Sequence, residues 1–183
     1  MAWAIGVALA GLTLLWLAWN LTLDALWQPT DRATVRRLLF VSELQAGEQL
    51  IDLGCGDGRI VIAAAREYDA QTVGVEIDPM RVMWARAWAF FAGVAKTTRI
   101  VRGNMYTYDV SGADVVILFL SATSNFRLQE RLRRTMKPGS RLVSYYHPMW
   151  GWTPDTVGES VDGYPIYMYR MGAHREAVIE TSL

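Results

Sequence analysis

The sequence predicts an α/β domain with a doubly wound sheet, and three observations support this prediction. Segments of strand character alternate with segments of helical periodicity from residue 47 onward. An apolar run ends at Leu53 in a turn that has glycine at every second position, as expected where a first strand leads into a ligand-binding turn. The N-terminal residues form a separate, uncharged stretch. The 183 residues suffice for one such domain and an N-terminal appendage.

Composition narrows the possible partners and sites. The chain has 18 Lys and Arg and 18 Asp and Glu, so its net charge is zero and its overall field does not attract nucleic acid. We therefore expect no nucleic-acid partner. Cys55 is the one cysteine, which excludes an internal disulfide and a cysteine-based zinc site, and we expect no metal.

Residues 1–27 are predicted to form a transmembrane anchor. No charged side chain occurs from Ala2 to Trp19, and at about 1.5 Å per residue this stretch is long enough to span a bilayer core. A signal peptide normally starts with basic residues and a helix packed on a domain normally has a polar stripe, and neither feature is present. Arg32, Arg36 and Arg37 follow the stretch, so the positive-inside rule predicts a single pass with the N-terminus outside and the main domain in the cytoplasm.

Residues 28–46 are predicted to form a linker helix, and residues 47–183 the α/β domain. Pro29 ends the apolar stretch, and Thr30 or Asp31 can cap a helix that runs to about Leu44. Two interpretations of this helix stay open, because it is either a simple linker or a segment that folds over the ligand pocket.

The stretch from Ile51 to Ile60 is expected to form a strand, a tight turn and the start of a helix over Asp57–Tyr68. Gly54, Gly56 and Gly58 allow positive φ and a close approach of the backbone to a ligand. The following helix points its N-terminal N–H groups at the same place.

The next expected strand spans Gln71–Ile77, and Asp78 and Pro79 then start a second helix that ends at Gly93. Apolar residues of this helix recur at helical spacing and form a stripe, which we expect to pack in the core against one face of the sheet. The stripe consists of Met80, Met83, Trp84, Ala87, Trp88 and Phe91.

The remaining expected elements are strands at Thr98–Arg102, Ala113–Leu120 and Arg141–Tyr146, a helix at Asn125–Lys137, and two short strands near Val157–Val161 and Pro165–Met171. The helix from Asn125 to Lys137 has a run of basic residues. Such a run is usually a solvated face, and contact with anionic lipid headgroups is the alternative.

Ligands of doubly wound sheets bind at the carboxyl ends of the strands, so the residues at these ends are the candidate site. Glu76 ends the second strand some twenty residues after the glycine turn, where a carboxylate can bind ribose hydroxyls, and the amide of Asn104 can pair with an adenine edge. The candidate cofactor-binding residues are Asp52, Gly54, Cys55, Gly56, Asp57, Glu76, Ile77, Asn104, Met105 and Phe119.

Two cofactors suit a glycine turn followed by a ribose-binding acid: a nicotinamide dinucleotide and S-adenosylmethionine. The dinucleotide fingerprint requires a third glycine at the position that Arg59 occupies. Asp52 and Asp57 would oppose a pyrophosphate but suit hydroxyls and the positive sulfonium of S-adenosylmethionine. These features favour S-adenosylmethionine, and a nicotinamide-dependent oxidoreductase is a distant alternative.

The motifs resemble those of a known enzyme family. D-L-G-C-G-D-G-R at 52–59 and G-V-E-I-D-P at 74–79 are similar to the first and second motifs of class I, seven-β-strand methyltransferases. The apolar N-terminus, the Pro-Thr pair at 29–30 and W-T-P-D at 152–155 resemble a narrower group. That group comprises the membrane-anchored lysine methyltransferases of mitochondrial inner-membrane proteins, such as the adenine nucleotide carrier and the ATP synthase c-subunit, and their prokaryotic relatives.

The resemblance implies a Rossmann-like class I methyltransferase sheet with helices on both faces, preceded by one transmembrane helix. It implies methyl transfer from S-adenosylmethionine to a lysine of a membrane-associated protein. Because no basic targeting peptide is present, we expect a prokaryotic relative in the inner membrane. Candidates for a water-poor substrate channel are Pro29, Thr30, Ser121, Tyr146, Trp150, Trp152 and Asp155, and the candidate general base is His147.

Other interpretations stay open. Each aromatic residue of the channel can instead be a packing residue, and His147 can be structural. The acceptor can be a lipid or a small apolar molecule, as the basic helix and the aromatic loop suggest. The chain can also be a non-catalytic, membrane-tethered module that binds the cofactor.

Overall fold

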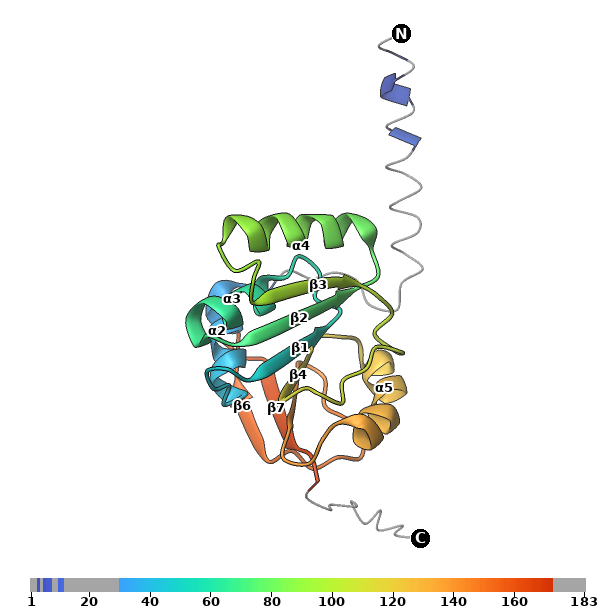
Figure 1. Ribbon diagram of the computed structural model, residues 1–183. Coiled ribbons are helices and arrows are strands. Elements are labelled where there is room, and N and C mark those ends of the chain that lie inside the picture. Colours follow the sequence, from blue (N-terminus) through green and yellow to red (C-terminus); the bar gives the residue numbers. More distant parts are fainter. Residues whose placement is uncertain (1–2, 4, 8–9, 12–29, 173–183) are drawn as a thin grey trace.

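Strands from the whole domain join in one seven-stranded mixed sheet in the order β3-β2-β1-β4-β5-β7-β6 (Figure 1). The computed structural model describes residues 3, 5–7, 10–11 and 30–172. The strands are β1 (Gln49–Leu53), β2 (Gln71–Glu76), β3 (Thr98–Arg102), β4 (Val115–Leu118), β5 (Arg141–Tyr145), β6 (Thr156–Glu159) and β7 (Pro165–Arg170). The helices of the domain are α2 (Arg32–Val41), α3 (Arg59–Tyr68), α4 (Pro79–Phe91) and α5 (Ala122–Thr135).

The central strands are parallel, and β7 is the reversed strand. β1 pairs in parallel with both β2 and β4, with Leu53 opposite Val75 on one side and Leu118 on the other. β7 is antiparallel to β5 and to β6. The carboxyl ends of β1, β2, β4 and β5 therefore meet at one edge of the sheet, as predicted for the ligand site.

Helices cover both faces of the sheet, as the sequence predicts. One apolar core lies under α2, α3 and α4 and includes Leu38, Val61 and Val82. The other lies under α5 and includes Leu128 and Leu132. Together these layers give the Rossmann-like methyltransferase fold that the motifs imply.

Helix α2, which falls in the predicted linker of residues 28–46, packs on the domain. The Asp31 side chain caps it by accepting hydrogen bonds from the amides of Ala33 and Thr34 at 2.8 and 3.0 Å. Leu38 and Leu39 are fully buried. The helix lies against α3 and the strands β5, β6 and β7. Thr30, just before the helix, lines the cavity described below, but no residue of α2 itself does, so the helix does not fold over the pocket.

The predicted burial of the α4 stripe is wrong. Met83, Trp84 and Phe91 are 59%, 64% and 83% exposed, whereas the buried side of the helix carries Val82, Ala85 and Ala89. The smaller residues recur at spacings of three and four, so they form a second stripe of helical period. They allow α4 to approach the sheet closely, since a Cβ on Gly58 would lie 3.2 Å from the Cβ of Ala85.

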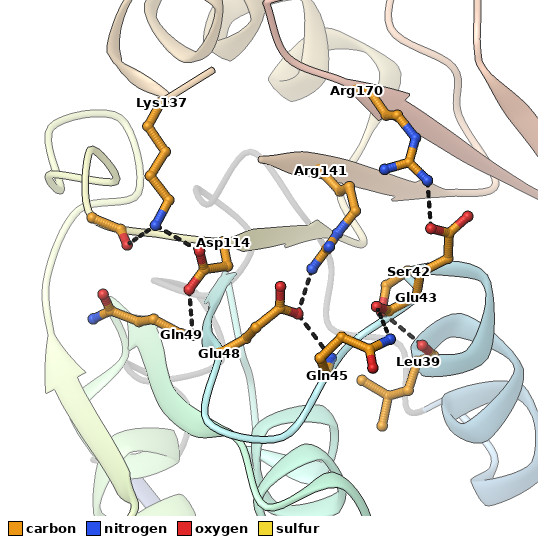
Figure 2. A network of polar contacts seen from close by, with 11 residues as sticks. Leu39, Ser42, Glu43, Gln45, Glu48, Gln49, Asp114, Lys137, Arg141 and Arg170 are labelled. Atoms are coloured by element: carbon orange, nitrogen blue, oxygen red, sulfur yellow. Dashed lines mark hydrogen bonds and ion pairs between the residues drawn. The ribbon is translucent and has the colours of Figure 1, made fainter. Parts of the chain in front are cut away.

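A polar network ties the amino ends of the strands together, at the edge opposite the candidate site (Figure 2). Asp114, just before β4, accepts a hydrogen bond from the Gln49 amide at 2.8 Å and pairs with Lys137 at 2.6 Å. Arg141, at the start of β5, pairs with Glu48. These charges are neutralised locally and lie away from the pocket, so we assign them a structural role.

The predicted anchor, residues 1–27, lies mostly outside the described residues. Within the part of the chain that the structure describes, no helix has the length and apolar character needed to cross a bilayer. Pro29, a predicted channel residue, also lies outside the described residues.

Candidate active site

A cavity of about 890 Å³ opens at the carboxyl ends of β1, β2, β4 and β5. It brings together most of the predicted site residues, from segments far apart in the sequence. The predicted residues that line it are Thr30, Asp52, Gly54, Cys55, Gly56, Asp57, Glu76, Ile77, Asn104, Met105, Phe119, Ser121, Tyr146 and His147.

The turn after β1 has the backbone conformation that its glycines allow. Gly54, Gly56 and Gly58 have φ of 86°, 55° and 81°. A Cβ on Gly54 would also lie 2.9 Å from the Leu120 side chain. Gly58 precedes α3 in the left-handed region, which is why the helix starts at Arg59 rather than at the predicted Asp57.

The Glu76 carboxylate at the end of β2 is fixed by backbone amides. Its Oε2 accepts a hydrogen bond from Gly56 at 3.0 Å, and its Oε1 accepts from Ile77 and Asp78, both at 2.9 Å. A carboxylate has about four acceptor positions, so one position remains for a ligand hydroxyl. The side chain is buried and lines the cavity, and its orientation is fixed before a ligand binds.

Asp52 lies at the end of β1 and is 2% exposed. Its Oδ2 is buried and has no hydrogen-bond partner within the described part of the chain. Burial, together with the neighbouring carboxylates of Glu76 and Asp57, raises the pKa of Asp52 to about 8. An acceptor in this position fits a ligand that brings a positive charge or a hydrogen-bond donor.

Asp57 is compensated within the site. The Arg59 side chain donates from Nε to Asp57 Oδ1 at 2.9 Å and forms an ion pair with the same carboxylate. Arg59 also donates to the carbonyl oxygen of Thr30. The repulsion of a pyrophosphate that the sequence suggested for Asp57 is therefore reduced, and Asp52 is the carboxyl group of the site with a buried oxygen that has no partner among the described residues.

The loop after β3 forms one wall of the cavity, and Arg131 of α5 holds it in place. The Arg131 guanidinium donates to the carbonyl oxygens of Tyr108 and Met105 at 2.6 and 2.7 Å. The Asn104 Oδ1 accepts a hydrogen bond from the Tyr106 amide at 2.9 Å, so it is used in an Asx turn. Arg131 belongs to the basic run that was predicted to be solvated, yet it is partly buried, and burial lowers its pKa.

Aromatic side chains from three segments form the opposite wall of the cavity. The Phe119 and Tyr145 rings lie 4.7 Å apart, and those of Tyr146 and Tyr164 lie 4.9 Å apart. Tyr146 has φ of 70°, which is uncommon for a residue with a large side chain and is typical of functional sites. Tyr146 directly follows β5, and in this conformation it lines the cavity.

His147 also lines the cavity, and its backbone is firmly held. Its carbonyl oxygen accepts hydrogen bonds from Ser144 Oγ at 2.6 Å and from Asn125 Nδ2 at 3.0 Å. Its ring packs edge-on against Tyr146 with 4.5 Å between centroids. The imidazole is thus positioned at the cavity. This position suits the predicted role as a general base, and it equally suits a role as an aromatic residue of the cavity wall.

Three predicted channel residues are placed elsewhere, which corrects the predicted channel. Trp150 is exposed and contacts Phe126 of α5, whereas Trp152 packs edge-on against Tyr169 of β7 at 5.6 Å. Asp155 accepts a hydrogen bond from the Arg170 amide at 2.8 Å and so joins β6 to β7. The loop from residue 147 to 155 turns toward α5 and β7 because Met149 is buried there and Trp152 packs against the same core.

The cavity also contains residues that the sequence did not indicate. These are Arg59, Arg81, Tyr106, Arg127, Tyr145 and Tyr164, with the apolar Ile60, Val75 and Leu120 and the glycine Gly103. Tyr164 comes from the turn between β6 and β7, and only the antiparallel pairing of β7 with β5 brings it to Tyr146. No local sequence pattern predicts that a residue of this turn lines the cavity.

Cys55 contributes to packing in the turn. It is 7% exposed, and burial raises the pKa of its thiol. A Cβ on Gly74 would lie 2.7 Å from the Cys55 Sγ, so the sulfur fills the space beside the glycine of β2. A protonated, enclosed thiol of this kind is unreactive.

Comparison with known proteins identifies the family. The family model described as the ANTKMT methyltransferase domain matches residues 52–156. A protein-lysine N-methyltransferase of Saccharolobus islandicus (strain REY15A) is 38% identical over 151 residues, which cover 80% of this chain and 94% of that protein. The chain belongs to the ANTKMT methyltransferase family.

Other members and structures agree with this assignment. The lysine N-methyltransferase of the ATP synthase c-subunit from Xenopus laevis is 32% identical over 149 residues, and the match spans 81% of this chain but only 64% of that protein. A crystal structure of an RNA methyltransferase from Salinibacter ruber, in complex with S-adenosyl-L-homocysteine, superposes with a TM-score of 0.78. It is 37% identical, and the match covers 81% of this chain and 96% of that one.

The cofactor of this ANTKMT-family methyltransferase is S-adenosylmethionine, and the residues of the cavity fit it. The unpartnered, buried Oδ2 of Asp52 suits the positively charged α-ammonium group, and the remaining acceptor position of Glu76 suits a ribose hydroxyl. The positive-φ glycine turn leaves room for the cofactor against the backbone. Within the described residues, no cluster of His, Cys, Asp or Glu that could hold a metal ion is found.

Proposed function

We propose that the protein is a protein-lysine N-methyltransferase that acts on a membrane-associated substrate. The observation that carries this proposal is the division of the cavity into two chemically different halves. The half next to β1 and β2 contains the Asp52 and Glu76 carboxylates, which suit the cofactor, and the half next to β5 contains the rings of Tyr145, Tyr146 and Tyr164. The relatives named as protein-lysine methyltransferases support lysine as the acceptor.

The aromatic half suits the chemistry of a lysine acceptor. A lysine amine must lose its proton before it can act as a nucleophile, and a water-poor environment favours the neutral form of the amine. The paired rings of Phe119 and Tyr145, and of Tyr146 and Tyr164, provide such an environment along the side chain of the acceptor. When bound, S-adenosylmethionine supplies the electrophilic methyl group, so the residues of the chain mainly orient the amine and exclude water.

His147 is the proposed proton acceptor. It lies on the cavity wall beside Tyr146, and its backbone position is fixed by Ser144 and Asn125. A ring nitrogen of the imidazole can accept the proton that an incoming ammonium group must lose.

We also propose that residues 1–27 anchor the enzyme in a prokaryotic inner membrane, with the domain in the cytoplasm. The uncharged stretch from Ala2 to Trp19 and the arginines after it support this topology. A protein held at the bilayer encounters membrane proteins preferentially, which supports a membrane-associated substrate.

Methyl transfer to native membranes tests the proposal. The full chain is incubated with isolated membranes and methyl-labelled S-adenosylmethionine, and labelled proteins are digested and mapped by mass spectrometry. We expect label on lysine side chains of membrane-associated proteins, and none with the variant Glu76→Ala. The exposed variant Glu67→Ala is the matched control and should label as the wild type does.

Other distributions of label would contradict the proposal. Label confined to extracted lipid would indicate a lipid methyltransferase. Label in added RNA but not in protein would instead favour the activity named for the Salinibacter ruber structure. Cofactor binding without transfer to any of these acceptors would indicate a non-catalytic binding module.

A further inference from the structure

The outward face of α4 is a continuous apolar surface. Its members, Met80, Met83, Trp84, Ala87, Trp88 and Phe91, are all exposed. They recur at spacings of three and four residues, so they lie on one side of the helix. Figure 1 shows α4 on the outside of the domain, with no described element beyond it. We call this surface the α4 outer face. Contiguous apolar surfaces of this kind mark interaction sites.

Basic residues flank the α4 outer face. From Pro79 to Tyr108 the sequence contains no aspartate or glutamate, although the chain has 18 acidic residues in total. The basic residues of the same segment are Arg81, Arg86, Lys96, Arg99 and Arg102. Two of them have side-chain partners, since Arg81 pairs with Asp78 at 3.7 Å and Arg99 donates to the Tyr108 hydroxyl at 3.3 Å, so the basic margin consists of Arg86, Lys96 and Arg102. The Arg86 guanidinium donates to the carbonyl oxygen of Ile100 at 3.0 and 2.9 Å, which fixes its charge beside the helix. Lys96 and Arg102 are exposed.

We infer that the α4 outer face is a membrane-docking surface that lies in the headgroup region of a bilayer containing anionic lipids. Helices that carry Trp and Phe on one face and basic residues at its margins bind in the plane of the interface. The apolar side chains enter the boundary of the acyl chains, and the basic groups interact with lipid phosphates. The inference rests on the proposed membrane association, but not on lysine as the acceptor.

The position of α4 relative to the cavity agrees with a bilayer as the partner. Ile77 and Arg81, at the start of α4, line the cavity together with Thr30. Thr30 is also where the described domain continues from the preceding N-terminal residues, which contain the uncharged stretch Ala2–Trp19. Ten residues join this stretch to Thr30, so a bilayer that holds the stretch lies within about 35 Å of the rim of the cavity from which α4 starts. Docking of α4 would hold the cavity mouth at the membrane surface.

A second copy of the chain is a less suitable partner. In a symmetric dimer the same surface meets itself, so Arg86, Lys96 and Arg102 of one protomer would approach those of the other. No acidic residue of the segment from Pro79 to Tyr108 is available to compensate these charges. The phosphates of anionic lipids would instead attract these basic groups, so a bilayer avoids the repulsion between protomers.

A fluorescent probe on the α4 outer face tests the inference. The full chain with Met83→Cys is labelled with an environment-sensitive NBD group and reconstituted into vesicles of phosphatidylcholine and phosphatidylglycerol. The matched control carries the label at Ser111→Cys, an exposed position next to Gly112, whose carbonyl oxygen accepts a hydrogen bond from Lys137 at the edge of the sheet opposite the cavity. Because Cys55 is buried, labelling should be confined to the introduced thiol, and the unsubstituted chain serves as the blank.

At position 83 we expect a blue-shifted emission and quenching by lipids that carry a spin label close to the headgroup. At position 111 we expect neither effect. The added substitution Trp84→Asp should reduce the quenching at position 83, whereas Val157→Asp, at another exposed apolar residue, should leave it unchanged. Vesicles of phosphatidylcholine alone should give weaker quenching, because the basic margin then has no anionic partner.

Several results would overturn the inference. A chain that floats with vesicles while the probe at position 83 stays solvent-exposed would show that α4 does not dock, and it would leave the proposed anchor intact. A chain that does not float would contradict both the anchor and the docking.

A blue shift without lipid quenching would indicate that protein, rather than lipid, covers the α4 outer face. The covering protein would be a second copy if the shift depends on protein concentration, and the chain's own N-terminal segment if it does not. Failure of lysine labelling in the membrane assay, with lipid quenching retained, would contradict the proposed acceptor alone.

Discussion

The Oε2 atom of Glu76 lies 3.0 Å from the amide nitrogen of Gly56, so the end of β2 is joined to the glycine turn after β1 across 20 residues of sequence. This bond and the two from the following amides orient the carboxylate toward the cavity. The side chain thus has two tasks, since it stabilises the turn and offers its remaining acceptor position to the cofactor.

The first prediction concerns this carboxylate. Glu76→Gln should weaken the binding of S-adenosylhomocysteine by about 1–3 kcal/mol, because one carboxylate acceptor becomes an amide donor and the buried amides lose partners. Titration calorimetry measures the change, which corresponds to about a 5- to 150-fold increase in Kd. The exposed variant Glu67→Gln is the control. Equal affinity of Glu76→Gln and wild type would mean that Glu76 does not contact the cofactor.

Asp52 gives a prediction about pH. Its pKa is about 8 in the folded protein and near 3.8 when unfolded, so between these values the folded state holds a proton that the unfolded state has lost. The unfolded state binds fewer protons, and the free energy of unfolding therefore falls as pH rises, by about 1.4 kcal/mol per pH unit from this group. Urea unfolding at pH values between these two pKa values should show that Asp52→Asn removes this contribution to the dependence of the free energy of unfolding on pH. The exposed variant Asp109→Asn should retain it.

The same group predicts a pH dependence of ligand binding. A ligand that brings an ammonium group to Asp52 binds best to the ionised carboxylate, so affinity for S-adenosylhomocysteine should increase as pH rises toward about 8. Below that pH, binding should release a proton, which calorimetry detects as a heat that varies with the ionisation enthalpy of the buffer. No buffer dependence in wild type at neutral pH would contradict the placement of the ammonium at Asp52.

A fourth prediction concerns Arg131, which holds the loop after β3 through two carbonyl oxygens. Arg131→Lys should lower the free energy of unfolding by about 1.5–3 kcal/mol, because a lysine cannot span both acceptors in the same way. It should also weaken cofactor binding, since Met105 and Asn104 line the cavity. Arg133→Lys, on the exposed side of the same helix, should alter neither property. If both variants behave alike, the loop does not depend on Arg131.

Gly74 provides a test of packing behind the cofactor turn. Gly74→Ala should destabilise the protein by about 1–3 kcal/mol, because the new methyl group would meet Cys55 Sγ at 2.7 Å and the Ile100 side chain at 3.0 Å. Gly103→Ala is the matched control, since its nearest contact would be an ordinary 3.4 Å from Val75. Thermal unfolding compares the two, and equal Tm values would show that the turn adjusts to the added atom.

The sequence predicts the cofactor half of the site well because its signals are local. Alternate glycines, an acid at the end of each of two strands and a following helix lie within short segments, and their spacing determines that they meet at one edge of a parallel sheet. The strands and helices are likewise confirmed near their predicted positions, β3 at identical bounds.

The errors arise where the outcome depends on distant segments. Helix α4 has two stripes of helical period, and close packing against the turn at Gly58 selects the one with the small side chains. Trp152 and Asp155 are placed by β7, and Tyr164 reaches the cavity only through the pairing of β7 with β5. Size and hydrophobicity alone do not distinguish a large exposed side chain from a buried one in such cases.

The hydrogen bond from Arg59 to the Thr30 carbonyl oxygen joins the cavity to the start of the domain. Arg59 binds Asp57 in the cavity and, at the same time, the residue that continues from the N-terminal stretch. A ligand that competes for Asp57 changes the hold on Thr30, and a pull on Thr30 changes the neutralisation of Asp57 to the same extent, because such coupling is reciprocal. Any ligand that alters the pair between Arg59 and Asp57 is therefore coupled to the position of Thr30 through one arginine.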